Sequence, residues 1–231
     1  CGEFISPECI TQFERLGVSD QMLASFPSSL TETVFYSQAG ARVSVPSEWF
    51  SKGGVALGLS RAEMDERLLR RAVRIGVDVR EETSVTSLKF ESDRVVGVNL
   101  KTGNSEKSVS APVTIDATGR SRILARMADR SIRTPSHQRE LVAFKAHLRN
   151  TRVASGACEI YFYRGGYGGL SSIENGLSNL CFIVNAREVR ACHSNADRVM
   201  REIVCRNQRA AHTLHEAVVD SDWLAVSLEG F

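Results

Sequence analysis

The chain has 231 residues, of which 42% are hydrophobic and 24% charged, a profile typical of a soluble globular protein and not of a disordered or fibrous one. No apolar run approaches the roughly 20 residues that span a bilayer, and the first residues carry no secretion signal, so we expect no integral membrane segment. The formal net charge of +2 is too small to favour nucleic acid as a partner.

The six cysteines include no Cys-x-x-Cys pair and are too few for a chain stabilised by disulfides. Free thiols in a reducing compartment fit this pattern, and we expect a cytoplasmic protein. The chain opens without Met at Cys1 and stops at Phe231 with no helix cap or polar tail nearby. These ends suggest a piece cut from a longer polypeptide.

End signals mark two helices in the first third of the chain. Ser6 and Pro7 begin one as N-cap and first residue, and Gly17 ends it. Residues 60–63 (Ser-Arg-Ala-Glu) form a capping box. An apolar stripe at helical spacing follows this box, and Gly76 is placed to end that helix in a left-handed conformation.

Strand patterns fill most of the remaining sequence. Between 33 and 59 they indicate a hairpin followed by an extended segment. A strand, a three-stranded meander and a buried strand that ends on an acidic residue are predicted at 77–80, 85–90, 95–100, 105–110 and 113–116.

The second half has the pattern of an antiparallel sheet followed by helices. Strands are predicted at about 140–149, 158–164, 167–173 and 178–185, and helices at about 195–207 and 210–219; a short helix is predicted earlier, at 122–129. The fold class is therefore α/β or α+β with two interleaved parts. An α/β part is predicted near 57–130, and an antiparallel sheet is predicted from 30–56 and 139–190.

Residues 116–121 (Asp-Ala-Thr-Gly-Arg-Ser) are the strongest candidate for a binding site. A glycine between a strand and a helix lets backbone amides approach a phosphate or ribose, and a carboxylate at a strand end accepts bonds from sugar hydroxyls. Asp116 and Gly119 are the residues in question. A plain strand-to-helix turn with Asp116 as its cap explains the same spacing equally well.

Two further features each have both a functional and a purely structural interpretation. Arg61 stands at the positive end of its helix, where a cation is locally unfavourable, although a solvated arginine is the commoner case. Residues 164–169 contain four glycines around Tyr167, which permits close approach of a ligand ring and also suits a bulged hairpin. No metal-ligand spacing is present, so we expect no metal site.

Several motifs together resemble the geranylgeranyl-reductase-like flavoproteins, within the p-hydroxybenzoate-hydroxylase-type FAD oxidoreductases. Residues 1–7 (Cys-Gly-Glu-Phe-Ile-Ser-Pro) are similar to that group's Lys-x-Cys-Gly-Glu-x-x-Ser-Pro segment. Residues 59–68 are similar to its Arg-x-x-Phe-Asp-x-x-Leu helix. The remaining matches are to its second FAD and pyridine-nucleotide motif and to its substrate-domain strands, at 116–121, 144–147, 159–162 and 166–170.

The resemblance implies FAD as cofactor and possibly NAD(P)H as donor. It implies a partial FAD-binding, Rossmann-like part with a β-meander at 1–30 and 57–135, and an antiparallel-sheet substrate domain with helices at 31–56 and 136–231. It implies that Arg61, Asp116 and Gly119 contact the cofactor and that Cys1 and Gly2 lie near the isoalloxazine. Phe162, Gly166 and Tyr167 would wall the substrate cavity.

The family's N-terminal GxGxxG unit and its C-terminal Gly-Asp segment are absent from this sequence, so the piece alone is not expected to hold FAD or to be active. The Trp-x-Trp-x-Ile-Pro signature of halogenases and the reductases' Tyr-x-Trp-x-Phe-Pro version are also missing. We therefore expect the central and substrate-binding portion of an FAD-dependent reductase or monooxygenase for a bulky apolar or aromatic substrate. The alternative is a non-catalytic binding or scaffolding domain derived from such a flavoprotein. No catalytic acid or base follows from the sequence, and neither does the oligomeric state.

Overall fold

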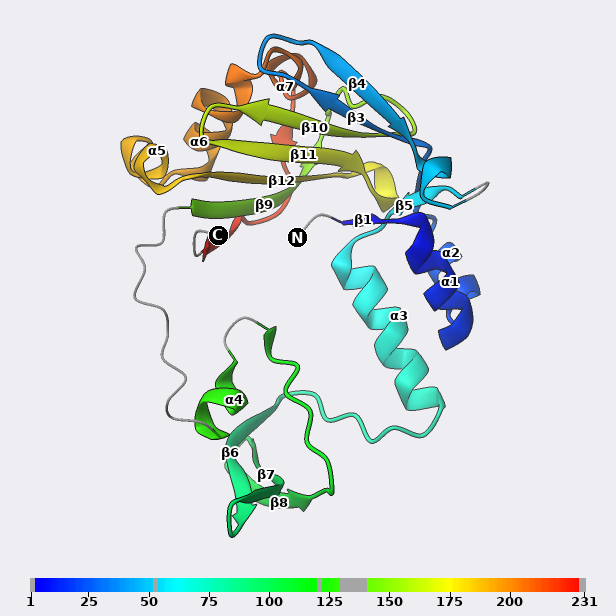
Figure 1. Ribbon diagram of the computed structural model, residues 1–231, viewed down its shortest axis with the longest axis vertical. Helices are drawn as coiled ribbons and strands as arrows, with labels where there is room; N and C mark the ends of the chain where they lie inside the picture. The colour runs from blue at the N-terminus through cyan, green and yellow to red at the C-terminus, as the bar shows by residue number, and fades with distance from the viewer. Residues whose placement is uncertain (1–2, 52–53, 120–121, 129–140, 229–231) are drawn as a thin grey trace. The chain divides into compact units, whose positions relative to one another are not determined.

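The computed structural model describes residues 3–51, 54–119, 122–128 and 141–228. The chain divides into two compact units (Figure 1). The first comprises Cys1–Ile75 and His137–Phe231, and the second comprises Gly76–Ser136.

An eight-stranded sheet forms the centre of the first unit. Its strands follow the order β13-β9-β12-β11-β10-β3-β4, with β14 also paired to β9. All neighbours are antiparallel except β10 and β3, which run parallel. The strands are β3 (Glu32–Tyr36), β4 (Arg42–Pro46), β9 (Leu141–Arg149), β10 (Ala157–Tyr163), β11 (Gly166–Ser172), β12 (Ser178–Asn185), β13 (Val218–Val219) and β14 (Leu224–Leu228).

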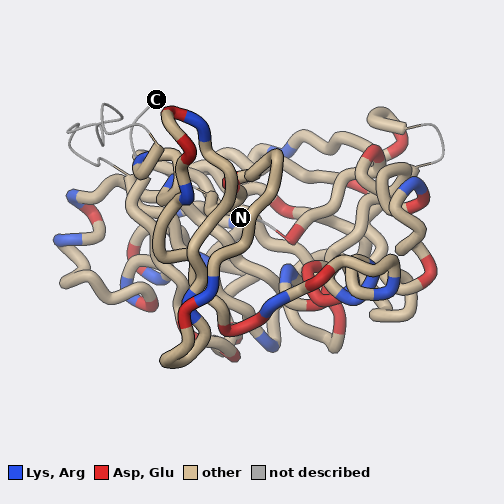
Figure 2. The backbone as a smooth tube through the Cα atoms, turned by 90° about the horizontal axis from the view of Figure 1, so that it is seen from below, with Lys and Arg blue, Asp and Glu red and all other residues tan. Residues whose placement is uncertain are grey.

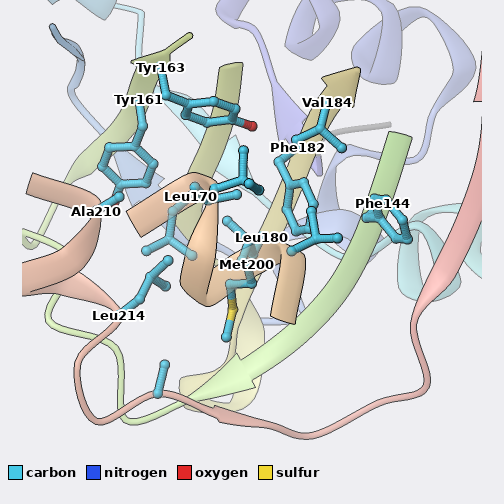
Figure 3. Packing of buried hydrophobic residues seen from close by; sticks show 14 of the residues in the cluster. Phe144, Tyr161, Tyr163, Leu170, Leu180, Phe182, Val184, Met200, Ala210 and Leu214 are labelled. Atoms are coloured by element: carbon cyan, nitrogen blue, oxygen red, sulfur yellow. The ribbon is translucent and has the colours of Figure 1, made fainter. Parts of the chain in front are cut away.

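Three short helices cover one face of this sheet (Figure 1). They are α5 (Ala186–Ala191), α6 (Ala196–Glu202) and α7 (Gln208–Thr213), with the 3-10 helix η4 (Val204–Arg206) between the last two. Strand alternation sends every second side chain toward them. Figure 3 shows the resulting core, in which Leu170, Leu180 and Phe182 from the sheet pack with Met200 and Leu214 from the helical side, all five at most 2% exposed.

The N-terminal segment of the same unit adds three short strands and three helices. The strands pair in the order β1-β5-β2, and α1 and α3 have the ends that the sequence predicts: Gly17 ends α1 with a φ of 66°, and the Ser60 hydroxyl accepts from the Glu63 amide at the start of α3. Two 3-10 turns, η1 (Ser47–Trp49) and η3 (Glu174–Gly176), also belong to this unit. The other bounds are β1 (Phe4–Ile5), β2 (Ser28–Leu30), β5 (Ala56–Gly58), α1 (Pro7–Leu16), α2 (Ser19–Leu23) and α3 (Arg61–Arg74).

The second unit contains the predicted meander. Strands β6 (Thr83–Glu91), β7 (Arg94–Thr102) and β8 (Ser105–Ser110) pair in that order, and the short helix α4 (Ile123–Ala128) packs on β6. The predicted mixed α/β fold with a β-meander and an antiparallel sheet is confirmed.

The predicted strands at 77–80 and 113–116 are wrong, because both segments are extended without a strand partner among the described residues. Val113 and Ile115 are 72% and 82% exposed, so the predicted burial is wrong as well. An extended apolar segment becomes a strand only where a neighbouring strand supplies hydrogen-bond partners, and the meander closes on its own three strands.

The two predicted helices near the C-terminus are shorter than expected. The first ends at Glu202. Asn207 has extended backbone geometry, and its side chain accepts hydrogen bonds from the amides of Arg209 and Ala210 at the start of α7. Its amide nitrogen also donates to the carbonyls of Tyr36, Ser37 and Phe162. These five hydrogen bonds fix Asn207 outside the helices, whereas periodicity alone predicts that the first helix extends to about residue 207.

Charges are interspersed over the described chain, as Figure 2 shows by the alternation of blue and red along the tube. None of the described helices is long and apolar enough to cross a membrane.

Candidate functional site

The face of the eight-stranded sheet that points away from α5–α7 is called the open face below. Its side chains come from alternate positions, such as Phe35 on β3, Phe162 on β10, Tyr167 on β11 and Lys145 on β9. In contrast to the helix-covered face, it carries exposed aromatic rings: Phe162 is 46% and Tyr167 48% exposed.

Two of the predicted cavity residues, Phe162 and Tyr167, meet on this face. They are directly paired across β10 and β11, with ring centroids 6.5 Å apart, and Phe162 stacks on Phe35 at 6.2 Å. A pocket of about 400 Å³ lies beside them, lined by Phe35, Ser37, Gln38, Ala41, Arg42, Val43, Phe162 and Tyr163. Its aromatic wall suits a flat apolar ligand.

Gly166, the third predicted cavity residue, has a packing reason to be glycine. A Cβ there would lie 1.9 Å from the Ile183 carbonyl oxygen, so the close neighbour on that side is the backbone of β12. Arg164 and Gly165 make the tight turn of a regular hairpin, and Gly165 has a φ of 84°. The run of glycines therefore builds the hairpin, and the side chain of Ile160 on the neighbouring strand lies beside Gly169.

The other end of the open face is polar and centres on the buried carboxylate of Glu3. This side chain is 1% exposed, forms an ion pair with Lys145 Nζ and is hydrogen-bonded to His147 Nε2 at 2.7 Å. It also accepts from the Arg61 amide at 2.8 Å. Burial by itself raises the pKa of Glu3, but the hydrogen bonds from Lys145, the Arg61 amide and His147 outweigh it and hold the pKa below its usual value.

Two carboxylates thus accept hydrogen bonds from the free backbone amides at the start of α3. Glu3 accepts from the Arg61 amide, and Glu174 accepts from the Ser60 amide at 2.9 Å. Both act on free amides at the positive end of a helix, where negative charge is stabilised. Sequence reasoning identified neither Glu174 nor the partners of Glu3. The signal it left unused was the strand parity of Lys145 and His147, which sends both side chains to one face.

The Arg61 side chain is half-exposed and paired with Asp65 at 2.9 Å, one turn along α3. Its backbone amide, rather than its guanidinium, enters the buried cluster. Cys1 and Gly2, the other residues predicted near the start of this segment, lie outside the described residues.

In the second unit, Asp116 and Gly119 form a tight turn before α4. The Asp116 carboxylate accepts from the Thr118 amide and hydroxyl at 2.9 and 2.7 Å, and from the Ala125 amide at 2.9 Å. The Thr118 hydroxyl and amide and the Ala125 amide lower the pKa of Asp116, so it stays ionised at neutral pH. Gly119 has a φ of 70°, and no atom of the described residues beyond its chain neighbours lies within 4 Å of where a Cβ would be.

A second buried carboxylate, Glu159, lies under the helix-covered face and was not anticipated. Arg209 contacts it at 2.6 and 3.0 Å, and the Tyr161 and Thr213 hydroxyls donate to it at 2.8 and 3.2 Å. Burial raises the pKa of Glu159, but the hydrogen bonds from Arg209, from the Tyr161 hydroxyl and from the Ala154 amide bring it below its usual value. Every partner belongs to this chain, so the network is structural.

The model of the FAD binding domain family matches residues 2–227. No curated protein shows a significant match. Solved structures with the same fold include the myxobacterial chondrochloren halogenase CndH, with 20% identity and a TM-score of 0.83 over 98% of this chain and 55% of that one.

A flavoprotein/dehydrogenase from Cytophaga hutchinsonii shares 19% identity with a TM-score of 0.83, covering 98% of this chain and 56% of its own. A geranylgeranyl bacteriochlorophyll reductase-like protein from Thermoplasma acidophilum shares 19% with a TM-score of 0.72, again covering 98% and 56%. The chain therefore spans a little over half the length of these structures.

Proposed function

This chain belongs to the FAD binding domain family, and from that premise we propose that it is the central, substrate-binding part of an FAD-dependent oxidoreductase for a bulky apolar or aromatic substrate. FAD is the cofactor of the family. When bound, it supplies the redox chemistry, and the protein supplies orientation and a dry cavity.

The observation that carries the proposal is the difference between the two faces of the eight-stranded sheet. One face is closed by α5–α7, whereas the other leaves Phe162 and Tyr167 about half-exposed beside a pocket of about 400 Å³. Exposed aromatic rings that line a pocket are typical of sites for flat apolar ligands. The proposed substrate therefore rests on the open face.

The residues at 116–119 fit a dinucleotide cofactor. The absence of a side chain at Gly119 and the open space around it leave the backbone accessible to a phosphate or ribose. Asp116 keeps its negative charge, which suits a partner with hydroxyl donors. Asp116 and Gly119 are therefore the described residues that we propose to contact FAD, with Arg61 as a third. We propose NAD(P)H as the electron donor.

Among the reactions of flavoproteins, we propose reduction or hydroxylation. Halogenases are among the solved structures of this fold, but sequence identities of 20% or less carry only the fold. The stretch 166–171 (Gly-Tyr-Gly-Gly-Leu-Ser) stands where halogenases have Trp-x-Trp-x-Ile-Pro.

The test uses the protein produced from its complete reading frame. We expect it to purify with bound FAD and to perturb the flavin absorbance when a bulky aromatic ligand is added. Phe162→Ala should weaken that ligand at least tenfold, whereas Phe90→Ala, which removes a ring of similar exposure (44% against 46%) on the meander, serves as the matched control. A protein without flavin would exclude the enzyme, and equal ligand affinity in both variants would exclude the open face as the substrate site.

A further inference from the structure

A second pocket of the first unit lies at the turn between β11 and β12. Its volume is about 520 Å³, which is within the range of small-ligand sites. Three separate stretches of the chain line it, and they include Phe26, Ser28, Asn150, Ser172 and Asn175. This pocket, called the turn pocket below, shares no lining residue with the pocket beside Phe162.

An exposed aromatic ring belongs to the turn pocket. Phe26 is 85% exposed, more than any other large apolar side chain in the described chain. Its φ is 52°, a left-handed value that bulky residues rarely adopt, and it precedes Pro27, which normally favours extended geometry in the residue before it. Glycine or asparagine would take this conformation with less strain. Neither burial nor backbone preference explains a phenylalanine here, and strain without such compensation at a pocket points to contact with a ligand.

Two carboxamides also line the turn pocket. Asn150 and Asn175 are exposed, and neither side chain has a hydrogen-bond partner within the described part of the chain. Both have a φ of 57°, which asparagine tolerates. Residues 175–176 (Asn-Gly) are typical of a tight hairpin turn, which explains the backbone of Asn175 and leaves its carboxamide unused. Each carboxamide offers two N–H donors and a carbonyl acceptor to a ligand.

Hydroxyl groups supply the rest of the polar lining. The Ser28 hydroxyl donates to the Ile173 carbonyl at 2.8 Å, so its lone pairs are what it can offer a ligand. Thr151 and Ser178 bond to each other at 2.7 Å, which uses one of their two hydroxyl hydrogens. No charged side chain is among the lining residues that the structure describes. A neutral ligand therefore suits the pocket better than a phosphate or a carboxylate, which would need a cation.

The mixture of groups specifies the chemistry of the ligand further. Carboxamides and hydroxyls each both donate and accept hydrogen bonds, and the hydroxyls of a sugar do the same. One face of a sugar ring carries mostly C–H groups, which pack on the face of an aromatic ring. A pyranose would therefore use the aromatic ring and the polar lining together.

We propose that the turn pocket binds a neutral sugar ring, with the C–H face of the sugar on Phe26 and its hydroxyls on the carboxamides of Asn150 and Asn175. The proposal stands apart from the proposed function, because the substrate is assigned to the open face. A free saccharide and the sugar group of a glycolipid share this chemistry, and the experiment separates these two sources.

The test uses the protein from the complete reading frame and two kinds of probe. The first is methyl β-D-glucopyranoside or methyl β-D-galactopyranoside, with binding measured by saturation-transfer NMR. The second is vesicles of phosphatidylcholine with and without glucosylceramide or galactosylceramide, with binding measured by co-sedimentation. Binding of a methyl glycoside supports a free saccharide, and binding only to the glycolipid vesicles supports a headgroup. Binding of neither probe would overturn the proposal.

Variants at Phe26 separate a role in binding from a role in folding. Phe26→Asn removes the ring and suits the left-handed backbone, so it should weaken the sugar about tenfold while the denaturant midpoint stays equal or rises. Phe26→Trp keeps an aromatic surface and should retain binding. Phe50→Asn removes another exposed ring of the same unit, 54% exposed and outside the turn pocket, and is the matched control. Wild-type sugar affinity in Phe26→Asn would refute the contact with Phe26.

Glycine variants test the carboxamides without disturbing the turns. Asn150→Gly and Asn175→Gly keep the left-handed backbone and remove the side chain, and each should weaken the sugar about fivefold. Asn104→Gly, at an exposed turn of the meander, should leave the affinity unchanged. Full affinity in both pocket variants would exclude the carboxamides from the site. Flavin content should be equal in all of these variants, so loss of the oxidoreductase function would leave the sugar measurement valid.

Discussion

The two faces of the eight-stranded sheet consist of side chains from the same strands but differ in burial and in hydrogen bonding. On the helix-covered face, large apolar side chains are fully buried, and the buried carboxylate Glu159 has all its partners within the chain. On the open face, aromatic rings remain exposed, and at the polar end the acceptor Asn179 Oδ1 has no partner among the described residues. The comparison teaches that a buried polar group does not by itself identify a site, and the proposed substrate site rests instead on the exposed aromatic rings of the open face.

The largest effect is expected where the helix-covered face is broken. Arg209→Met leaves Glu159 buried without its cation and should lower the free energy of unfolding by about 3–5 kcal/mol, measured by denaturant titration. The double variant Glu159→Leu, Arg209→Met removes both charges and should recover much of that loss. A single-variant loss below about 1 kcal/mol would contradict a buried, partnered carboxylate.

A matched pair of phenylalanines contrasts the faces directly. Phe182 is 1% exposed in the helix-side core and Phe162 is 46% exposed on the open face. Phe182→Ala should cost about 3–5 kcal/mol of unfolding free energy by opening a cavity, and Phe162→Ala about 1 kcal/mol or less. Equal costs would show that the open face is covered in the folded protein.

Acid should weaken both faces through their carboxylates. Glu3 and Glu159 each have a pKa held below 4.5, the ordinary value, so their stabilisation is fully present above pH 4.5 and is lost as the pH falls through the folded-state pKa. Each group contributes at most about 1.4 kcal/mol per pH unit in that window. Glu3→Gln should flatten the acid limb of unfolding free energy against pH, and an unchanged slope would rule out the Glu3 contribution.

The smallest effect on stability is expected at the start of α3. Arg61 and Arg70 each pair with an acidic residue one turn away, Asp65 and Glu66, in exposed ion pairs, so alanine at either should change stability by about 0.5 kcal/mol or less. Only Arg61→Ala should reduce FAD retention, measured as flavin occupancy after dialysis of the whole protein. Equal occupancy in the two variants would exclude Arg61 from the cofactor site.

Local signals predicted the elements whose ends are chemically marked. The helices α1 and α3 were predicted because their end signals are local: Pro7 and Gly17 begin and end α1, and the Ser60 hydroxyl accepts from the Glu63 amide at the start of α3. The three-stranded meander was predicted from alternating apolar residues and from turn residues, which are also local signals. The segments 77–80 and 113–116 have an equally strand-like composition, but a strand depends on a partner that no local pattern reports.

Side-chain partners far apart in the chain escaped sequence reasoning. Glu159 has the strand parity of Tyr161 and Tyr163, which assigns it to the buried face, but nothing nearby reveals Arg209 as its counterion. The helix predicted at about 195–207 ends at Glu202, and Asn207 instead caps α7 while carbonyls from two distant strands and a turn accept its amide hydrogens.

The sequence by itself determined which residues share a face of each strand and where the capped helices begin and end, because these follow from backbone periodicity and local hydrogen bonds. Only the tertiary structure decided which face the helices cover and which face stays open. It also joined Glu3 to Lys145 and His147, 142 and 144 positions later. Such contacts form only when the whole sheet is assembled. A buried charge is then stabilised by the hydrogen-bond and ion-pair partners that the topology places next to it, because burial removes its solvation by water.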